Sequence, residues 1–417
     1  MRCAFGRCGL AATAVLLMGL AACGGGGSAS DPSGSPPVVT VVDNTQPVVV
    51  DYGPTVNGQS VGYNDALYTT VTICMPGTTT CQSIDHVLVD TGSTGLRIVS
   101  SLVTLSLPFT TDASNNPIGN CIQYVDSTYQ WGPVAKVDVQ LAGEVAPSVP
   151  IQIVGASNFA AAPAACSAGG TPAQNVTDLG AKGILGLGNY RQDCGPACAS
   201  TSPPAIYFTC PAAGCTPTAV AVSAQLQNPV WLFPQDNNGL SIVLPQIGAT
   251  GAVSVSGNMI FGIGTQSNNA LGTAQAQALD DSGYFTTTYN GVAYPQSFID
   301  SGSNGLFFLD STTTGLPDCA SNSIAQGFYC PTSPVGFSAI TSGPNPNGAG
   351  AKVSANIAFS IANGLTLLSS PAVAFNNVGG SNPGAFDWGL PFFFGRSVFI
   401  GIEGQYTGTA VGPFWAF

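Results

Sequence analysis

The sequence predicts an all-β protein, and three features support this prediction. Gly and Pro are abundant, at 53 and 31 of the 417 residues, and both favour turns. Charged residues make up only 7% of the chain, while Val, Thr, Ser and Tyr are frequent, which favours strands. No long window has the 3.6-residue period of an amphipathic helix. The length allows about two domains with a large core.

The first 23 residues have the organisation of an export signal. Arg2 and Arg7 precede an apolar run at 10–20, which is too short to span a membrane. The signal ends in the sequence LAAC, which resembles a bacterial lipobox in which Cys23 would be lipidated; an ordinary signal peptide is the alternative. We therefore expect a lipoprotein anchored in the bacterial cell envelope. Gly24 is not the Asp that favours retention at the inner membrane, so we expect the outer membrane.

Residues 24–45 are expected to form a flexible tether, because their first part is rich in Gly, Ser and Pro. The formal net charge of the chain is −12, and removal of the two signal arginines makes it more negative. Such a charge argues against nucleic acid or an anionic membrane surface as a partner. Contact with the membrane would then be through the lipid anchor only, and we expect a monomer.

Ten cysteines remain once Cys3, Cys8 and Cys23 are assigned to the signal. An even number in an exported protein predicts up to five disulfides. A zinc site built from the four cysteines between 194 and 215 is the alternative, but their spacing fits no compact zinc pattern, and we expect no metal. Pairing of neighbours along the chain gives Cys74–Cys81, Cys194–Cys198, Cys210–Cys215 and Cys319–Cys330, and leaves Cys121 with Cys166.

The first half of the chain is expected to form a series of strands. An aromatic-rich hairpin around 121–132 could overhang a cleft, or its tyrosines could simply pack across the strands. Residues 190–220 hold four cysteines among Pro, Ala and Gly and are expected to be an irregular insertion. The expected strands are 38–42, 46–53, 64–75, 86–90, 134–143, 147–155, 228–234, 239–246 and 258–264, with a short apolar run at 181–188.

The second half is expected to repeat this plan, with an N-terminal unit at 46–255 and a C-terminal unit at 256–417. We expect strands at 282–292 and in the segment that leads into Asp300, then a loop bracketed by cysteines. The closing apolar run at 386–404 is interrupted by Gly, Pro and Arg396, so it is expected to be core strand and not a membrane span.

Two copies of one pattern dominate the sequence. VLVDTGSTGLRIV and SFIDSGSNGLFFL each place an aspartate, Asp90 or Asp300, after apolar residues. Each aspartate is followed by a hydroxyl residue, Gly, Ser, a small polar residue, Gly and Leu. An internal repeat of this length suggests two related half-domains that each supply a carboxylate. A third Asp-Ser-Gly at 281–283 follows polar residues and lacks the continuation, so it predicts an ordinary turn.

The chain contains a single histidine, His86. This excludes histidine-rich metal sites and leaves few of the common catalytic mechanisms. A GxSxG pattern at 58–62 lies in a polar segment with no strand before it and no helix after it, which argues against a serine hydrolase. No phosphate-binding or dinucleotide-binding pattern lies between a strand and a helix, so no cofactor is expected.

Paired carboxylates can hydrolyse an amide with an activated water. Two carboxyl groups held close together cannot both ionise freely, so they share one proton. The ionised group takes a proton from the water while the protonated group hydrogen-bonds the carbonyl oxygen. The glycines of the two turns would allow close approach, and the hydroxyl residues would link the turns and orient the carboxylates. These supporting residues are Thr91, Gly92, Ser93, Ser301, Gly302 and Ser303.

On these motifs, the chain over about residues 46–417 resembles the pepsin-like aspartic proteases, in a bacterial lipoprotein branch. The two aspartate segments look like the active-site loops of that family. CIQYVDSTYQWG looks like its flap hairpin, with Tyr124 at the position of the flap tyrosine. KGILGLG resembles the apolar-apolar-Gly segment behind the first loop, and the Asp-Trp-Gly at 387–389 would be its counterpart in the second half.

The resemblance implies two related β lobes with a central cleft, and an endopeptidase that cleaves extended polypeptides with Asp90 and Asp300. The alternative is a catalytically silent scaffold of this type that binds a protein or glycan in the cell envelope. Departures in the flap favour the alternative: Val125 and Ser127 replace glycines, and Arg97 replaces the tryptophan that supports the flap tyrosine.

Overall fold

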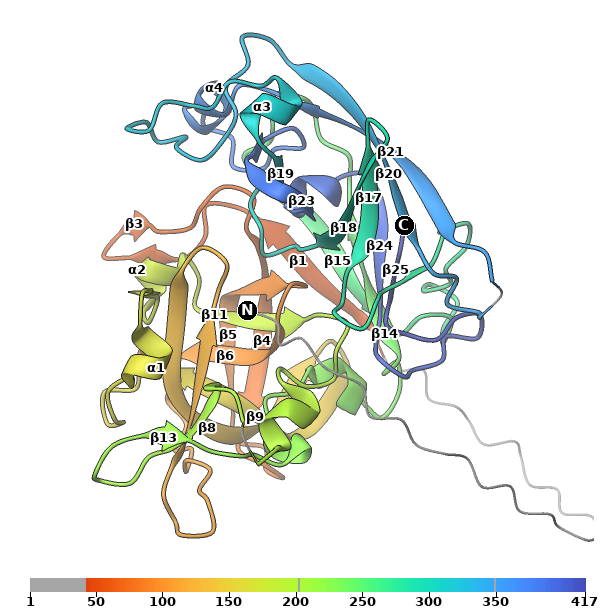
Figure 1. Ribbon diagram of the computed structural model, residues 1–417. Coiled ribbons are helices and arrows are strands. Elements are labelled where there is room, and N and C mark those ends of the chain that lie inside the picture. Colours follow the sequence, from red (N-terminus) through yellow and green to blue (C-terminus); the bar gives the residue numbers. More distant parts are fainter. Residues whose placement is uncertain (1–42, 202, 349) are drawn as a thin grey trace, which may run out of the picture.

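The computed structural model describes residues 43–201, 203–348 and 350–417, drawn in colour in Figure 1. The expected export signal with Cys23 and the strand expected at 38–42 lie outside the described residues. The described chain is all-β, as predicted, and no helix in it is longer than five residues. In this part of the chain no helix is long and apolar enough to cross a membrane.

Sixteen strands of the described chain form one large sheet, in the order β13-β12-β7-β8-β9-β6-β11-β5-β4-β1-β15-β14-β24-β25-β16, with β10 paired to β8. Strands β1 and β15 are antiparallel over six residue pairs, so residues from both halves of the chain share this sheet. The strands are β1 (Thr45–Val50), β4 (Leu67–Cys74), β5 (Cys81–Asp90), β6 (Thr94–Val99), β7 (Ile118–Gln123), β8 (Thr128–Leu141), β9 (Glu144–Val154), β10 (Thr171–Pro172), β11 (Gly183–Leu187), β12 (Tyr207–Thr209), β13 (Thr216–Pro217), β14 (Gly239–Leu244), β15 (Val255–Phe261), β16 (Gln277–Ala278), β24 (Arg396–Gly401) and β25 (Phe414–Ala416).

Seven further described strands form a second sheet, in the order β21-β20-β17-β18-β23-β19-β22. In Figure 1 this sheet occupies the upper part of the molecule, strands β4 to β13 occupy the lower part, and β1 and β15 lie between them. The strands of the second sheet are β17 (Phe285–Tyr289), β18 (Val292–Ile299), β19 (Leu306–Leu309), β20 (Val335–Gly343), β21 (Val353–Ile361), β22 (Gly379–Gly380) and β23 (Asn382–Trp388). In a separate hairpin, β2 (Thr55–Val56) pairs with β3 (Gln59–Ser60).

The helices are short connections. The α-helices are α1 (Ala164–Ser167), α2 (Val176–Leu179), α3 (Ser311–Thr314) and α4 (Gly364–Leu368), and the 3₁₀ helices are η1 (Ser100–Leu102), η2 (Gly195–Ala199), η3 (Val222–Ala224), η4 (Pro229–Leu232) and η5 (Leu390–Phe392). The strand expected at 228–234 is wrong, because η4 occupies this segment. The Asn228 side chain accepts a hydrogen bond from the amide of Val230, and Pro229 fits the first turn of a helix, where no amide hydrogen is needed.

All five expected disulfides are present within the described residues, and the predicted pairing is confirmed. The four cysteines of the zinc alternative are bonded to each other, so the zinc site is excluded. The bond between Cys121 and Cys166 joins β7 to α1, and the Gln123 side chain also donates to the carbonyl oxygen of Cys166, at 2.7 Å. The hairpin β7–β8 is therefore tied close to its tip, because Gln123 and Tyr129 are the last residue pair before the turn.

Aromatic side chains from strands of the second sheet pack into one cluster. The rings of Phe308 and Phe386 stack at 5.3 Å, and Phe386 stacks on Trp388 at 5.5 Å. Trp388 is 1% exposed and lies directly behind the turn that follows β18. This packing fixes the position of that turn, because close-packed aromatic rings leave the backbone little freedom to shift.

Candidate active site

The first aspartate turn follows a strand that is buried on both faces. Strand β5 ends at Asp90 in four consecutive buried residues, and β6 begins at Thr94. Strand β11 lies between them, parallel to β5 and antiparallel to β6. The apolar run before the aspartate thus becomes a central strand, and the turn places Asp90 at its carboxyl end.

The second aspartate turn has the same surroundings. Strand β18 ends at Ile299, β19 begins at Leu306, and β23 lies between them, parallel to β18 and antiparallel to β19. The register pairs Trp388 with Ile299, as it pairs Leu185 with Val89. The Asp-Trp-Gly at 387–389 therefore takes the position that the segment at 184–186 has in the first half.

Hydrogen bonds between the two turns hold them together. The Ser301 amide donates to Thr91 Oγ1 at 2.9 Å, and the Thr91 amide donates to Ser301 Oγ at 3.2 Å. The Ser301 hydroxyl in turn donates to the carbonyl oxygen of Val89 at 2.7 Å. Both hydroxyl residues are buried, at 2% and 0% exposed. The structure thus places the two predicted linking residues where they join the turns.

The two carboxylates meet at the backbone of these turns. The Gly92 amide donates to Asp90 Oδ1 at 2.8 Å and also lies 3.1 Å from Asp300 Oδ1. On the other side, the Gly302 amide donates to Asp300 Oδ1 at 2.7 Å. A Cβ atom on Gly302 would lie 2.8 Å from Asp90 Oδ1, and one on Gly92 would overlap the Asp300 carboxylate. Only glycine permits this approach.

Serine hydroxyls contact the outer oxygens of the pair. Ser93 Oγ donates to Asp90 Oδ2. Ser303 Oγ lies 3.1 Å from Asp300 Oδ2, but it also lies 2.6 Å from Oδ2 of a third carboxyl group, Asp387. The orienting role predicted for the two serines is consistent with this geometry, and the second serine has an additional partner.

The electrostatics of the pair favour a single shared proton. Burial raises the pKa of Asp300, and the nearby charge of Asp90 and a hydrogen bond with its side chain raise it further. Hydrogen bonds from Gly302 and Ser303 oppose the shift. Asp90 is buried at 5% exposed, while Asp300 is partly exposed. At moderate pH, Asp300 therefore holds a proton beside Asp90, which is the arrangement that acid–base work on a bound water requires.

The predicted flap residue lies at the end of the β7–β8 hairpin. The Tyr124 amide donates to the carbonyl oxygen of Thr128 at 2.9 Å, and Val125 at the tip is 89% exposed. Burial raises the pKa of Tyr124, as do the charges of Asp90, Asp126 and Asp300, while the nearby Arg97 lowers it. The tyrosine is thus within electrostatic reach of the pair. Its buried hydroxyl has no hydrogen-bond partner among the described residues.

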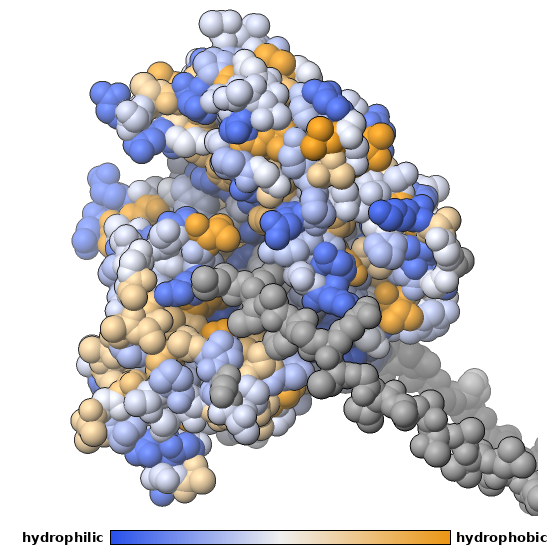
Figure 2. All heavy atoms as spheres, in the orientation of Figure 1, coloured by the Kyte–Doolittle hydropathy of each residue, from blue (hydrophilic) through white to orange (hydrophobic). Residues whose placement is uncertain are grey.

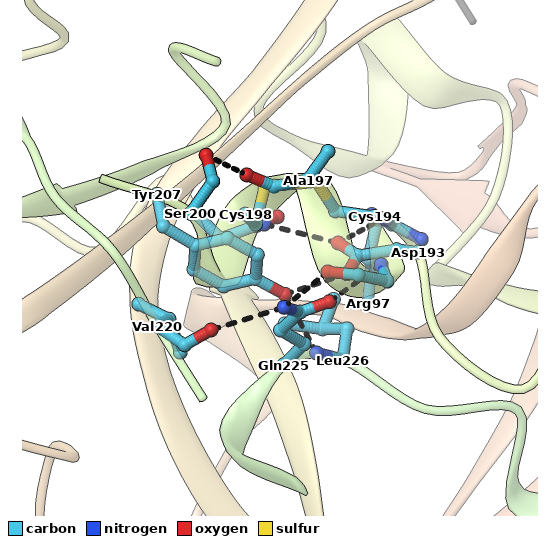
Figure 3. The surroundings of a disulfide bond; sticks show 12 residues. Arg97, Asp193, Cys194, Ala197, Cys198, Ser200, Tyr207, Val220, Gln225 and Leu226 are labelled. Atoms are coloured by element: carbon cyan, nitrogen blue, oxygen red, sulfur yellow. Dashed lines mark hydrogen bonds and ion pairs between the residues drawn. A yellow bond between two sulfur atoms is a disulfide. The ribbon is translucent and has the colours of Figure 1, made fainter. Parts of the chain in front are cut away.

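Arg97 is fully buried in β6, in the surroundings that Figure 3 shows. Its Nη1 donates to the carbonyl oxygen of Thr94 at 2.9 Å, and its Nη2 lies 3.7 Å from Asp193 Oδ2. The hydroxyl of Tyr207 donates to the other oxygen of Asp193 at 2.7 Å. Burial raises the pKa of Asp193 to about 6, although Arg97 and Tyr207 lower it. The sequence reveals the change to arginine but not its carboxylate partner.

Two residues near the pair were not predicted as site residues. Asp387 contacts Ser303. The sequence placed it in the counterpart of the apolar-apolar-Gly segment, as a carboxylate inside an apolar run, but did not mark it as a site residue. The pKa of Tyr63 is raised well above its ordinary value, first by burial and then by Tyr68, Asp90 and Asp300. Tyr63 lies in a loop segment with no pattern that could have marked it.

The residues that suggested other catalytic sites are exposed or contact side chains outside the aspartate pair. Ser60 of the GxSxG pattern is exposed on β3, and the His86 ring contacts Asp85 at 2.6 Å and Asp51 at 3.3 Å. Asp281 of the third Asp-Ser-Gly is exposed in a turn, as predicted. Figure 2 shows a surface indented at the left edge, between the part that carries α3 and α4 and the part that carries β3.

A family model described as "Protein of unknown function (DUF3443)" matches residues 40–417. No curated protein matches the chain.

Proposed function

The chain belongs to the DUF3443 family of proteins of unknown function, and we propose that it is an aspartic endopeptidase with a pepsin-like fold of two lobes. The lobes would cover residues 46–255 and 256–417, with one aspartate from each. The observation that supports this most directly is the contact between the two aspartate turns, in which the Gly92 amide reaches Oδ1 of both Asp90 and Asp300.

The proposed reaction needs only the two carboxyl groups and a bound water. Asp90 takes a proton from the water, while Asp300 donates its proton to the carbonyl oxygen of the scissile amide. The water oxygen bonds to the carbonyl carbon and forms a tetrahedral intermediate. When the C–N bond breaks, the proton on Asp90 moves to the leaving nitrogen and a hydroxyl proton of the intermediate returns to Asp300. The pair then has its starting protonation.

The proposed substrate is an extended polypeptide that lies between the flap hairpin and the pair. A strand-like peptide can hydrogen-bond to the backbone at a hairpin tip, while its alternate side chains enter pockets. Tyr124 and the exposed Val125 would contact such a peptide from above. The surface indentation in Figure 2 is consistent with an open groove at one side of the molecule.

The proposal is tested with the soluble chain from residue 43, assayed against a diverse peptide library between about pH 3 and pH 7. We expect cleavage by wild type and a loss of at least about 100-fold in Asp90→Asn and Asp300→Asn, because each removes one half of the acid–base pair. Asp281→Asn is the matched control, since it changes the same tripeptide in an exposed turn. Cleavage that survives in Asp90→Asn would contradict the proposed mechanism.

The second candidate function is a binding scaffold without catalysis. It is favoured by the flap, where the hydroxyl of Tyr124 has no partner among the described residues and Ser127 adopts a φ of 66° in place of a glycine. A binder would take up library peptides with equal affinity in wild type and Asp90→Asn and cleave none of them. That combined result would exclude the endopeptidase.

A further inference from the structure

A hollow of about 520 Å³ lies beside the last strand of the second sheet, β21. It is lined by residues 357–360 of β21 and by the segment between β23 and β24, which ends at Arg396. Trp388 borders it as well, but neither aspartate of the pair nor any residue of the β7–β8 hairpin does. Its volume lies in the range of pockets that hold small ligands. The hollow is therefore separate from the aspartate pair.

Arg396 is the one charged residue among those that line the hollow, and it is partly buried. Its Nη1 donates to the carbonyl oxygen of Phe392 at 2.6 Å, and its Cζ lies 4.5 Å from the centre of the Phe392 ring. No ion pair of Arg396 is found within the described residues, and burial alone lowers its pKa. A guanidinium has five N–H donors, and the described hydrogen bonds use one of them. An anion in the hollow would offset the cost of burying this charge.

Within the described residues, the chain itself supplies no such anion. Carboxylates are not scarce, since 20 acidic residues stand against 8 basic ones, yet none of the described ones lines the hollow. The ring of Phe417 contacts that of Phe392 at 5.0 Å, but the Phe417 backbone oxygen accepts from the Gln275 amide at 3.3 Å. The guanidinium is therefore available to an anion from another molecule.

The strand that lines the hollow has an unpaired edge. Among the described strands, β21 pairs with β20 alone and ends the second sheet. In an antiparallel pair, alternate residues point their N–H and C=O groups away from the partner strand. Residues 357–360 make no further backbone hydrogen bond within the described chain. Because side chains alternate between faces, four consecutive lining residues mean that the hollow faces the backbone edge of β21.

A row of aromatic rings connects this edge to the guanidinium. The Phe359 ring contacts that of Trp388 at 5.2 Å, and the Trp388 ring contacts that of Phe392 at 5.5 Å. Phe359 is only partly buried, so it offers apolar surface to the hollow. The hollow thus combines an unpaired backbone edge, an apolar surface and a cation.

We propose that this hollow binds the C-terminal end of an extended polypeptide. Arg396 holds its carboxylate, the edge of β21 pairs with its backbone, and an apolar last side chain packs against Phe359 and Phe392. A peptide C-terminus carries a carboxylate next to backbone N–H and C=O groups, which is the combination that the hollow can satisfy. The inference does not rest on the proposed endopeptidase, because it involves no catalytic step.

The test measures the fluorescence anisotropy of a labelled peptide with the full-length protein. The peptide is a short chain of alternating Val and Thr that ends in Phe, made with a free carboxylate or as the C-terminal amide. Asp90→Asn is present throughout, so that the proposed cleavage does not remove the peptide. We expect the free acid to bind at least about 10-fold more tightly, because the amide lacks the charged hydrogen bonds to the guanidinium. Equal affinity of the two peptides would overturn the inference.

Arg396→Gln should bring the free acid to the affinity of the amide, because it removes the charge and keeps a donor for the carbonyl oxygen of Phe392. Lys352→Gln is the matched control, since it removes the same charge at an exposed position directly before β21. The control should keep the full preference for the free acid. A preference that survives in Arg396→Gln would place the peptide elsewhere on the protein and overturn the inference.

Two further comparisons need no substitution at Arg396. N-methylation of one alternate set of peptide amides should weaken binding at least about 10-fold, and methylation of the other set should leave it unchanged, because only alternate N–H groups face the paired strand. Equal effects would contradict the pairing with β21. Hexanoate carries a carboxylate without a peptide backbone, so it should displace the labelled peptide at least about 10-fold less well than the unlabelled peptide does. Equal displacement would show a site for small carboxylates and overturn the assignment to a polypeptide.

Discussion

At the scale of single residues, the site depends on the absence of two side chains. The Gly92 amide contacts the carboxylate of the other turn, the Gly302 amide contacts that of its own turn, and a Cβ atom on either glycine would lie against the carboxylate of the other turn. Thr91 and Ser301 can then bond across the turns at hydrogen-bond distance. The close approach of the carboxyl groups, and so the shared proton, follows from these small residues.

Gly92→Ala is expected to separate the two carboxyl groups and to lower kcat/KM by at least about 100-fold, because misplacement of reacting groups by about 1 Å has an effect of this size. The chain should remain folded, since the disulfides and both sheets lie outside the turn. Gly336→Ala is the matched control, because a Cβ atom there meets nothing within 4 Å. Equal activity of the two variants would show that the contact at Gly92 is not needed.

At the scale of elements, a buried ion pair contacts the β7–β8 hairpin through one hydrogen bond, from the Asn120 side chain in β7 to Asp193 Oδ2 at 3.2 Å. Strand β6 supplies Arg97, and Asp193 precedes the disulfide between Cys194 and Cys198 that is drawn in Figure 3. Burial raises the pKa of Asp193 more than Arg97 lowers it, so that the pKa lies at about 6, above the ordinary value of an aspartate. The ion pair between Arg97 and Asp193 is therefore sensitive to pH.

The pH dependence follows from the sign of this shift. Between about pH 4 and the folded-state pKa of about 6, the folded chain holds a proton on Asp193 that the unfolded chain has released, so stability falls as the pH rises. Two pKa units correspond to about 3 kcal/mol at most. Asp193→Asn should lack this part of the slope in denaturant unfolding followed from about pH 4 to pH 7. Identical slopes for the variant and wild type would contradict the assignment of the titration to Asp193.

At the scale of the whole molecule, the two halves of the chain share a sheet. Strand β15 begins at Val255, close to the predicted boundary, and lies between β1 and β14. Strand β24, also from the second half, pairs with β14 as well. The large sheet therefore contains paired strands from both units, 46–255 and 256–417. The two aspartate turns nevertheless have the same local arrangement of strands.

A fragment of residues 46–255 is accordingly expected not to fold by itself. Without β15 and β24, strands β1 and β14 would each expose an unpaired edge and an uncovered apolar face. We expect weak near-UV circular dichroism and no cooperative unfolding for the fragment, whereas the chain from residue 43 should unfold cooperatively. A fragment with a sharp unfolding transition of its own would show that the shared strands are not required.

The sequence predicts those features that depend on neighbours along the chain. The strand before Asp90 and the turn after it follow from a short apolar run and from glycine. The pairing of nearby cysteines is confirmed for four bonds, and the fifth, Cys121–Cys166, joins the two cysteines that this pairing left over. The strand expected at 228–234 is wrong because Asn228 and Pro229 favour a helical turn over the apolar residues around them. Strands β20 and β21 were missed because their exposed positions, apart from Ile340, are filled by polar and small residues, which weaken the apolar signal.

By itself, the sequence determined the all-β class, the two aspartate turns and the disulfides, because each is written in local patterns and repeats. Only the tertiary structure decided which distant groups meet. The contact of Ser303 with Asp387 spans 84 positions, and the link between Thr91 and Ser301 spans 210. Such contacts depend on how sheets pack and register, and no local pattern encodes the result. The third carboxyl group beside the pair is therefore a property of the folded chain.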